Sequence, residues 1–277
     1  MNATAQRLRL LWRSPAGRFA LVVLAGVVIA AVFAPWFAPF DPALQQMADR
    51  LMPPSRAHWL GTDGLGRDEL SRLIYGARPT LGLAALVVVL TVPIGLAIGI
   101  VSAYAGSWIE RMLMRLTDIF MAFPRLVLAL AFVGLLGPGL INGALALVLT
   151  GWPAYARLAR AEVAVMRRSD YLAAAEMQGI SGVRLLWGHM LPMCLPSARV
   201  RLALDLASII LTGASLGFLG LGVRPPQAEW GTMVAEGSKV IFDQWWIAAI
   251  PGTAILLLSL AFNLLADALR DVSDPAS

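Results

Sequence analysis

Residues 170–196 read DYLAAAEMQGISGVRLLWGHMLPMCLP, and this stretch decides how the rest of the chain is interpreted. It is a polar, arginine-bearing insert between long apolar segments. Alanine-rich residues 171–178 predict a helix about 12 Å long. Gly179 suits the positive φ at which helices end, and residues 183–189 predict a second short helix. Two interpretations stay open: a rigid elbow that docks a partner protein, or an interfacial helix whose arginines snorkel to the headgroups.

The composition of the chain indicates an integral membrane protein. Of its 277 residues, 58% are hydrophobic and only 14% are charged, and the mean hydropathy is +0.73. Soluble domains carry about 25% charged residues, so this chain has too little polar surface to cover a core in water. The only cysteine is Cys194, which excludes an intrachain disulfide. The net charge of +5 would suggest nucleic acid in a soluble protein, but we expect no such partner here.

Six apolar stretches approach the ~20 residues needed to cross the hydrocarbon core, and they predict an all-α polytopic protein with six transmembrane helices. Gly137-Pro138-Gly139 forms the tight turn between the third and the fourth. The first follows a basic segment, but Pro35 after a cleavage-like site predicts a retained signal anchor. The expected spans cover residues 19–38, 80–104, 117–137, 140–158, 200–222 and 247–267.

The distribution of basic residues predicts the orientation, because cytoplasmic loops are enriched in arginine and lysine. With the N-terminus inside, 14 arginines fall on the cytoplasmic side and seven basic residues outside. Both termini and residues 159–199 are then cytoplasmic. We divide the chain into an anchor helix with its outer loop (1–79) and a core domain (80–277). The 14 are Arg7, Arg9, Arg13, Arg18, Arg111, Arg115, Arg157, Arg160, Arg167, Arg168, Arg184, Arg199, Arg201 and Arg270.

Ionisable residues inside the expected spans are functional hypotheses, because charge is costly in hydrocarbon. Asp118 and Arg125 are seven residues apart, which predicts one helical face about two turns apart. The alternative is that Asp118, Asp205 and Asp267 lie at the cytoplasmic interface and pair with arginines. Arg125 follows Phe123-Pro124, where a kink would free carbonyls, so it either pairs with these or lines an aqueous path.

Motifs for metals, nucleotides and catalysis are absent. Residues 60–68 superficially suggest a calcium loop but lack EF-hand spacing, and we expect a turn-rich cap before an amphipathic stretch. Residues 189–194 combine His, Met and Cys, yet Pro192 constrains the backbone and Met commonly fills apolar packing. The sequence has no P-loop and no hydrolase motif. We therefore expect no metal, no cofactor and no catalytic residue.

The segment 222–246 contains tryptophans and charges on the expected outer side. Tryptophan at an interface usually anchors a helix, whereas the charges are suited to receiving a protein partner. The candidates for contact with an external protein are Glu229, Trp230, Glu236 and Lys239.

Seven segments, in order along nearly the whole chain, resemble the permease subunits of ABC importers. The resemblance is to the dipeptide, oligopeptide and nickel branch, and to its subunit with a short cytoplasmic N-terminus. It implies the type I permease fold in a bacterial inner membrane. The segments are HWLGTDGLGRDELSRLIYGARPTL (58–81), RLTDIFMAFPRLVLAL (115–130), GPGLIN (137–142), WPAYARLAR (152–160), GHMLPMCLPS (188–197), SLGFLGLGVRPPQAEWGTM (215–233) and AFNLLADALRDVSDP (261–275).

The resemblance implies a complex with a second permease, two cytoplasmic ATPases and an external solute-binding protein. It identifies the insert as the ATPase-coupling loop. The family motif reads Glu-Ala-Ala, three residues, then Gly; here Ala173 replaces the glutamate, and Glu176 lies three positions later. The implied coupling residues are Tyr171, Ala173, Ala174, Ala175, Glu176, Gly179, His189 and Pro192. Candidate pore residues are Arg125, Asn142, Thr212 and Ser215.

The substrate stays open between alternatives. Peptides are the first hypothesis, and nickel or a metal chelate is the second, because AEWGTM (228–233) resembles nickel-type members. A secondary transporter would need broken helices repeated in both halves, and we find no internal repeat. An intramembrane enzyme would need a nucleophile and base at depth, which two histidines do not supply. The resemblance assigns ATP hydrolysis to the partner subunits.

Overall fold

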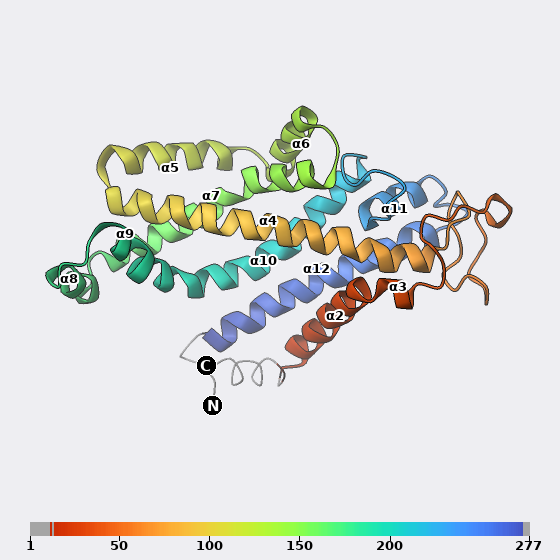
Figure 1. The fold of residues 1–277 in the computed structure, drawn as a ribbon, viewed down its shortest axis with the longest axis horizontal. Helices are drawn as coiled ribbons and strands as arrows, with labels where there is room; N and C mark the ends of the chain where they lie inside the picture. The colour runs from red at the N-terminus through yellow and green to blue at the C-terminus, as the bar shows by residue number, and fades with distance from the viewer. Residues whose placement is uncertain (1–11, 13, 274–277) are drawn as a thin grey trace. The chain divides into compact units, whose positions relative to one another are not determined.

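The computed structural model describes residue 12 and residues 14–273, and it is built of helices (Figure 1). Arg7, Arg9 and Arg13, which entered the orientation argument, lie outside the described residues. Within them the only extended pairing is an isolated bridge between Thr62 and Asp68. The longer helices are α2 (Pro15–Val32), α4 (Glu69–Ala105), α5 (Ser107–Ala122), α6 (Arg125–Leu136), α7 (Leu140–Met166), α10 (Leu191–Phe218) and α12 (Trp246–Ser273). The shorter ones are α3 (Ala34–Phe37), α8 (Asp170–Met177), α9 (Gly182–Leu185) and α11 (Trp230–Ser238).

Four helical segments are long and apolar enough to cross a membrane, namely α2, α4, residues 182–218 and α12. The α5–α6 pair adds a fifth if it counts as one broken span. Helix α7 is 27 residues long and carries its charges in its second half, so the fold is consistent with the six predicted spans. The chain is thus an all-α polytopic membrane protein.

The apolar segment predicted over 117–137 is divided between two helices. Helices α5 and α6 meet at Phe123-Pro124 and are bent by 94°. Pro124 lacks a backbone N–H and disfavours helical geometry at Phe123, which has extended φ and ψ of −94° and 143°. The kink expected at Pro124 is therefore confirmed, but Asp118 and Arg125 fall on different helices and share no helical face.

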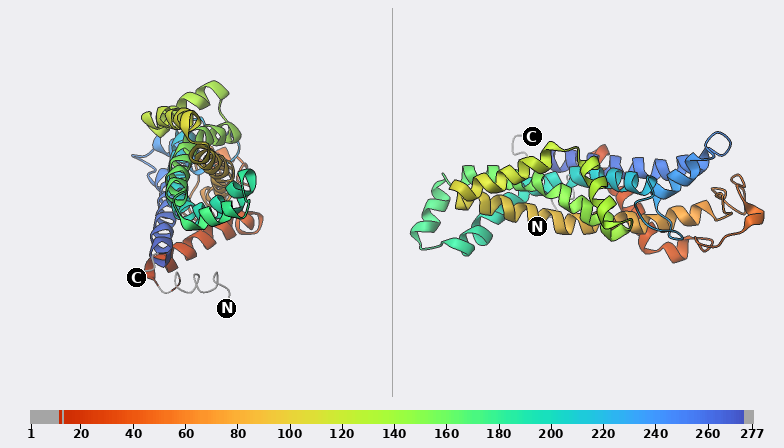
Figure 2. Two further views of the ribbon diagram at one scale, coloured as in Figure 1. Left: turned by 90° about the vertical axis from the view of Figure 1, so that its left-hand side faces the viewer. Right: turned by 90° about the horizontal axis from the view of Figure 1, so that it is seen from above.

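The chain forms two compact units, each described here by itself. Unit 1 comprises Met1–Leu86, Phe132–Ala144 and Ala203–Ser277. In it α12 packs against α2 and α11 (Figures 1 and 2). Helix α2 ends at Val32, earlier than the predicted span end at residue 38. Arg78 explains how this end is stabilised, because its Nε donates to the Ala31 carbonyl at 2.6 Å and its Nη2 to the Val32 carbonyl at 3.1 Å.

Unit 2 comprises Val87–Ala131 and Leu145–Leu202. Its core joins α4, α7, α8 and the 182–198 segment through buried side chains. Two glycines let the backbones of α4 and α7 touch. A Cβ at Gly95 would lie 2.6 Å from the Trp152 carbonyl oxygen, and one at Gly99 would lie 2.2 Å from that of Ala156. The buried core side chains include Leu96, Ile100, Ala159, Val163, Leu172, Ala175, Leu185, Met190 and Cys194.

Candidate functional site

Helix α8 forms the predicted elbow, with one buried and one exposed edge. Leu172 and Ala175 are 2% and 5% exposed and belong to the core of unit 2. Gly179 ends the helix with φ of +79°, as expected, and its N–H donates to the Glu176 carbonyl at 2.9 Å. The opposite edge is exposed and consists of Tyr171, Ala173, Ala174, Glu176 and Met177. The helix therefore presents two alanines, with larger side chains on either side of them, outward from a fixed base.

The second short helix predicted over 183–189 is not a separate element. Helix α9 covers only Gly182–Leu185, and a π-helical turn over Leu186–Met190 then leads directly into α10. Pro192 has no backbone N–H to continue the regular pattern there, which accounts for the wider turn. The elbow therefore continues without a break into the long helix 182–218.

Hydrogen bonds stabilise this loop internally and attach it to α4 within unit 2. The Tyr171 hydroxyl lies 2.8 Å from His189 Nδ1, which joins α8 to the π-helical turn. The Gly182 N–H donates to the Tyr104 hydroxyl at 3.2 Å, and Arg167 Nη1 donates to the Ala103 carbonyl at 2.9 Å. Arg167 thus caps the end of α4. Neither Tyr104 nor Arg167 belongs to a local motif, so neither was predicted as a contact of this loop, and Arg167 was used only to predict the orientation.

Charged side chains connect α5 to α7. Arg157 Nη2 donates to Asp118 Oδ1 at 2.6 Å, and Arg160 Nη2 lies 2.6 Å from Glu110 Oε1. The expected pairing of Asp118 with an arginine is thus shown, whereas its expected position at the cytoplasmic interface stays a prediction. Arg125 is the first residue of α6, and its guanidinium packs close to the backbone of Gly151 on α7. A Cβ added to Gly151 would lie only 3.0 Å from Arg125 Nη2. Asp205 is buried, whereas Asp267 is exposed.

The loop over residues 60–68 is a folded cap closed by buried ion pairs. Arg67 Nε donates to Asp63 at 2.6 Å, and Arg72 also pairs with Asp63. Both arginines then reach Glu236 Oε2 on α11, each at 2.8 Å. His58 Nδ1 lies 2.9 Å from Asp68 Oδ1. Within the described residues no group of three His, Cys, Asp or Glu side chains is arranged to hold a metal.

Two of the expected outer contact residues lie in the interior instead. Glu229 and Trp230 are 6% and 2% exposed, so the prediction that they contact an external protein is wrong for this conformation. Glu229 caps α11, since its carboxylate accepts from the N–H groups of Gly231 and Thr232 at 2.9 Å each. Burial raises the pKa of the Glu229 carboxyl, and these two hydrogen bonds oppose that rise. Lys239 is exposed.

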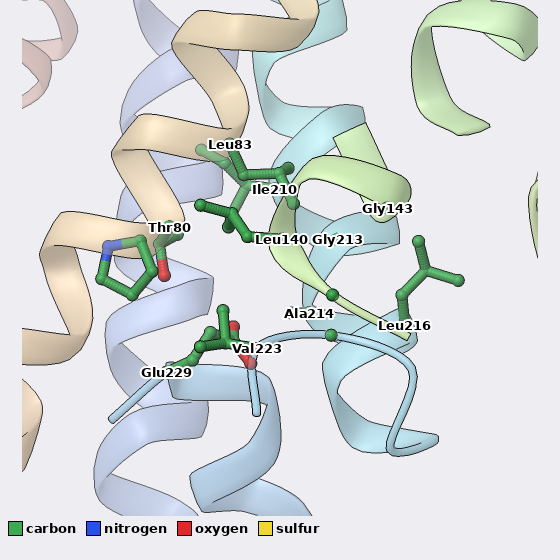
Figure 3. Close-up of a pocket in the computed structure, with 13 residues that line it drawn as sticks. Thr80, Leu83, Leu140, Gly143, Ile210, Gly213, Ala214, Leu216, Val223 and Glu229 are labelled. Atoms are coloured by element: carbon green, nitrogen blue, oxygen red, sulfur yellow. The ribbon is translucent and has the colours of Figure 1, made fainter. Parts of the chain in front are cut away.

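A small apolar cavity lies beside Glu229 (Figure 3). Its volume is about 20 Å³, enough for one water molecule but far below the several hundred Å³ of a solute site. A Cβ at Gly217 would lie 2.2 Å from Glu229 Oε2, so only glycine fits there. The cavity is therefore part of the packing of unit 1 rather than a binding pocket. Its walls include Thr80, Leu83, Leu140, Ile210, Val223 and Glu229.

The remaining candidate pore residues satisfy their polar groups locally. Asn142 Nδ2 donates to the Leu136 and Gly137 carbonyls at 2.8 and 3.1 Å, closing the end of α6. The hydroxyls of Thr212 and Ser215 each donate to the carbonyl four residues earlier in α10. Their place in a pore stays a prediction.

Comparison with known proteins gives the family. Residues 95–277 match the model of the binding-protein-dependent transport system inner membrane component, and residues 4–54 match that of the N-terminal transmembrane domain of oligopeptide transport permease C. A probable D,D-dipeptide transport system permease of Escherichia coli is 41% identical over 270 residues, covering 96% of this chain and 91% of the relative. A di/tripeptide permease of Pseudomonas aeruginosa is 45% identical, with 90% and 84% covered. A dipeptide permease of Escherichia coli is 43% identical, with 92% and 87% covered. The chain belongs to the family of binding-protein-dependent transport system inner membrane components.

Proposed function

We propose that this chain forms half of the translocation path of an ABC importer for di- and oligopeptides. The observation that carries the proposal is the high identity, over nearly its whole length, to permeases named for peptide transport. None of these three relatives is named for nickel, so they favour peptides over the nickel alternative. A second, similar permease would complete the path.

The exposed edge of α8 is the docking element for one of two cytoplasmic ATPases. Its small side chains, Ala173 and Ala174, permit close approach of a partner groove. Its opposite edge is fixed in the core of unit 2 by Leu172 and Ala175, so force on α8 passes into the helices that share this core. Glu176, exposed on the docking edge, supplies a carboxylate where Ala173 lacks one. The chain itself does not hydrolyse ATP.

An external solute-binding protein docks on the other side of the membrane. Lys239 is exposed and Glu236 is partly exposed at the end of α11, so these two remain from the predicted contact set. This assignment places both termini and the 159–199 loop in the cytoplasm, which agrees with the arginine distribution. The complex would alternate between an inward-open and an outward-open state driven by ATP.

A coupling test follows from the two edges of α8. Ala174→Arg places a long charged side chain on the docking edge without entering the core, so we expect peptide uptake to fall about tenfold or more while the chain remains in the membrane. Ala164→Arg, at an exposed position on α7, is the matched control. The measurement is peptide uptake and ATP hydrolysis in proteoliposomes that contain the whole complex.

Copurification identifies the partners. A tagged chain extracted gently from its native membrane should retain a sister permease and ATPases, identified by mass spectrometry. A folded chain that is recovered alone and transports peptide without ATPases would overturn the proposal and favour a secondary transporter.

A further inference from the structure

The pair formed by Asp118 and Arg157 is unusually placed for an ion pair of a membrane protein. It joins α5 to α7 at 2.6 Å, yet the side chains are 62% and 52% exposed on the surface of the chain. Both residues belong to unit 2. The pair is therefore accessible at the surface of the two helices that it connects.

The neighbouring helix α4 gives the position of this pair along the apolar helices. Residues 79–105 of α4 contain no Asp, Glu, Lys, Arg or His and are about 40 Å long, which exceeds the ~30 Å hydrocarbon core. Ala156 of α7 packs against α4 between Gly95 and Gly99. A Cβ added to Gly95 would lie 3.3 Å from the Ala156 nitrogen, and one added to Gly99 would lie 2.2 Å from the Ala156 oxygen. Arg157 therefore lies beside the interior of this uncharged run, about 9 Å or more from its end at Ala105.

Hydrocarbon does not solvate a half-exposed ion pair, so groups of this kind normally face a water-filled path or another protein. A second cation lies deeper on the same unit. The Arg125 guanidinium lies close to Gly151. A Cβ added to Gly151 would also lie 3.0 Å from the side chain of Thr91 on α4. Thr91 is close to the middle of the uncharged run. Charge thus continues from Arg157 on α7 to Arg125 beside the middle of this uncharged run.

We propose that Asp118 and Arg157 form a binding site for zwitterionic peptides on the inner half of the translocation path. This inference rests on the proposed peptide permease function. The ammonium group of a passing peptide pairs with Asp118 and its carboxylate with Arg157, whose guanidinium suits planar carboxylates. An extended dipeptide spans about 7 Å, so its two ends reach both side chains once the pair separates.

The ion pair also explains how such a site releases its ligand. In the empty state each charge is satisfied by the other, so neither is left without a counter-charge in the membrane. When a peptide binds, the ion pair between Asp118 and Arg157 is replaced by two ion pairs with the peptide's ends. When the peptide leaves, Asp118 and Arg157 pair with each other again. Conduction requires this balance, because a site in a path must be entered and left easily.

Cysteine accessibility tests whether water reaches this site. In a Cys194→Ala background, Asp118→Cys in the assembled complex should react with a membrane-impermeant methanethiosulfonate reagent, and added dipeptide should slow that reaction. Ile119→Cys is the matched control, because Ile119 is adjacent and 58% exposed but apolar. It should resist the reagent. An inert Asp118→Cys, or equal reaction at both positions, would overturn the proposal.

Neutral variants separate binding from helix attachment. Asp118→Asn and Arg157→Gln should each lower peptide uptake per ATP hydrolysed by about tenfold or more. The double variant D118N/R157Q keeps two side chains that can hydrogen bond between α5 and α7, and its uptake should stay as low as that of either single variant. The double variant E110Q/R160Q removes the ion pair nearer the end of α7 and should retain uptake.

Full uptake in D118N/R157Q would show that transport does not need the two charges and would overturn the site. Loss of uptake in the E110Q/R160Q control would do the same, because removal of any ion pair between α5 and α7 would then be harmful. Failure of the proposed function is distinguishable, because the unmodified complex would then transport no peptide at all.

Discussion

At the scale of single residues, Glu229 shows how one buried carboxylate stabilises a helix and makes stability depend on pH. Its raised pKa means that the folded state binds the proton more tightly than the unfolded state does. The contribution of Glu229 to stability is therefore largest below the ordinary pKa of 4.5 and decreases as pH rises toward the folded pKa. Glu229→Gln should flatten this part of the pH profile of thermal unfolding, at the cost of a weaker cap on α11. An unchanged profile would contradict the assignment.

At the scale of elements, Arg167 attaches the loop that contains α8 to the end of α4. Its guanidinium caps a carbonyl of α4, and Tyr104 receives the N–H of Gly182 from the same loop. Arg167→Gln should lower peptide uptake per ATP about threefold to tenfold, because α4 would follow α8 less closely. Arg168→Gln, at the adjacent exposed residue, is the control. Equal effects of the two substitutions in a reconstituted transport assay would show a general charge effect instead.

The elements also show what the sequence could predict. Helix α8, its end at Gly179 and the break at Pro124 follow from local preferences of alanine, glycine and proline, and all three were predicted. The size of the bend, the interior position of Glu229 and the partners of Arg67 were not. Arg67 pairs with Glu236, 169 residues away, and no local pattern carries that information.

At the scale of the whole molecule, this pairing joins the loop before α4 to α11 near the other end of the chain. Arg72→Met would leave Asp63 and Glu236 with one cation fewer in a buried site, and we expect a loss of about 3 kcal/mol of stability. Arg56→Met, at an exposed position of the same loop region, should cost little. Thermal unfolding of the two purified variants, followed by loss of helical circular dichroism, measures the difference. Equal melting temperatures would contradict the structural role of the cap.

The contact of α4 and α7 at Gly95 and Gly99 has a practical consequence for measuring motion. Where two backbones touch this closely, sliding of one helix past the other would bring carbonyl groups into clashing contact, so we expect the two helices to move together at this crossing. Spectroscopic labels on α4 and α7 on either side of it should keep one separation throughout turnover. That fixed separation offers an internal ruler, against which movements of every other helix of the transporter can be calibrated.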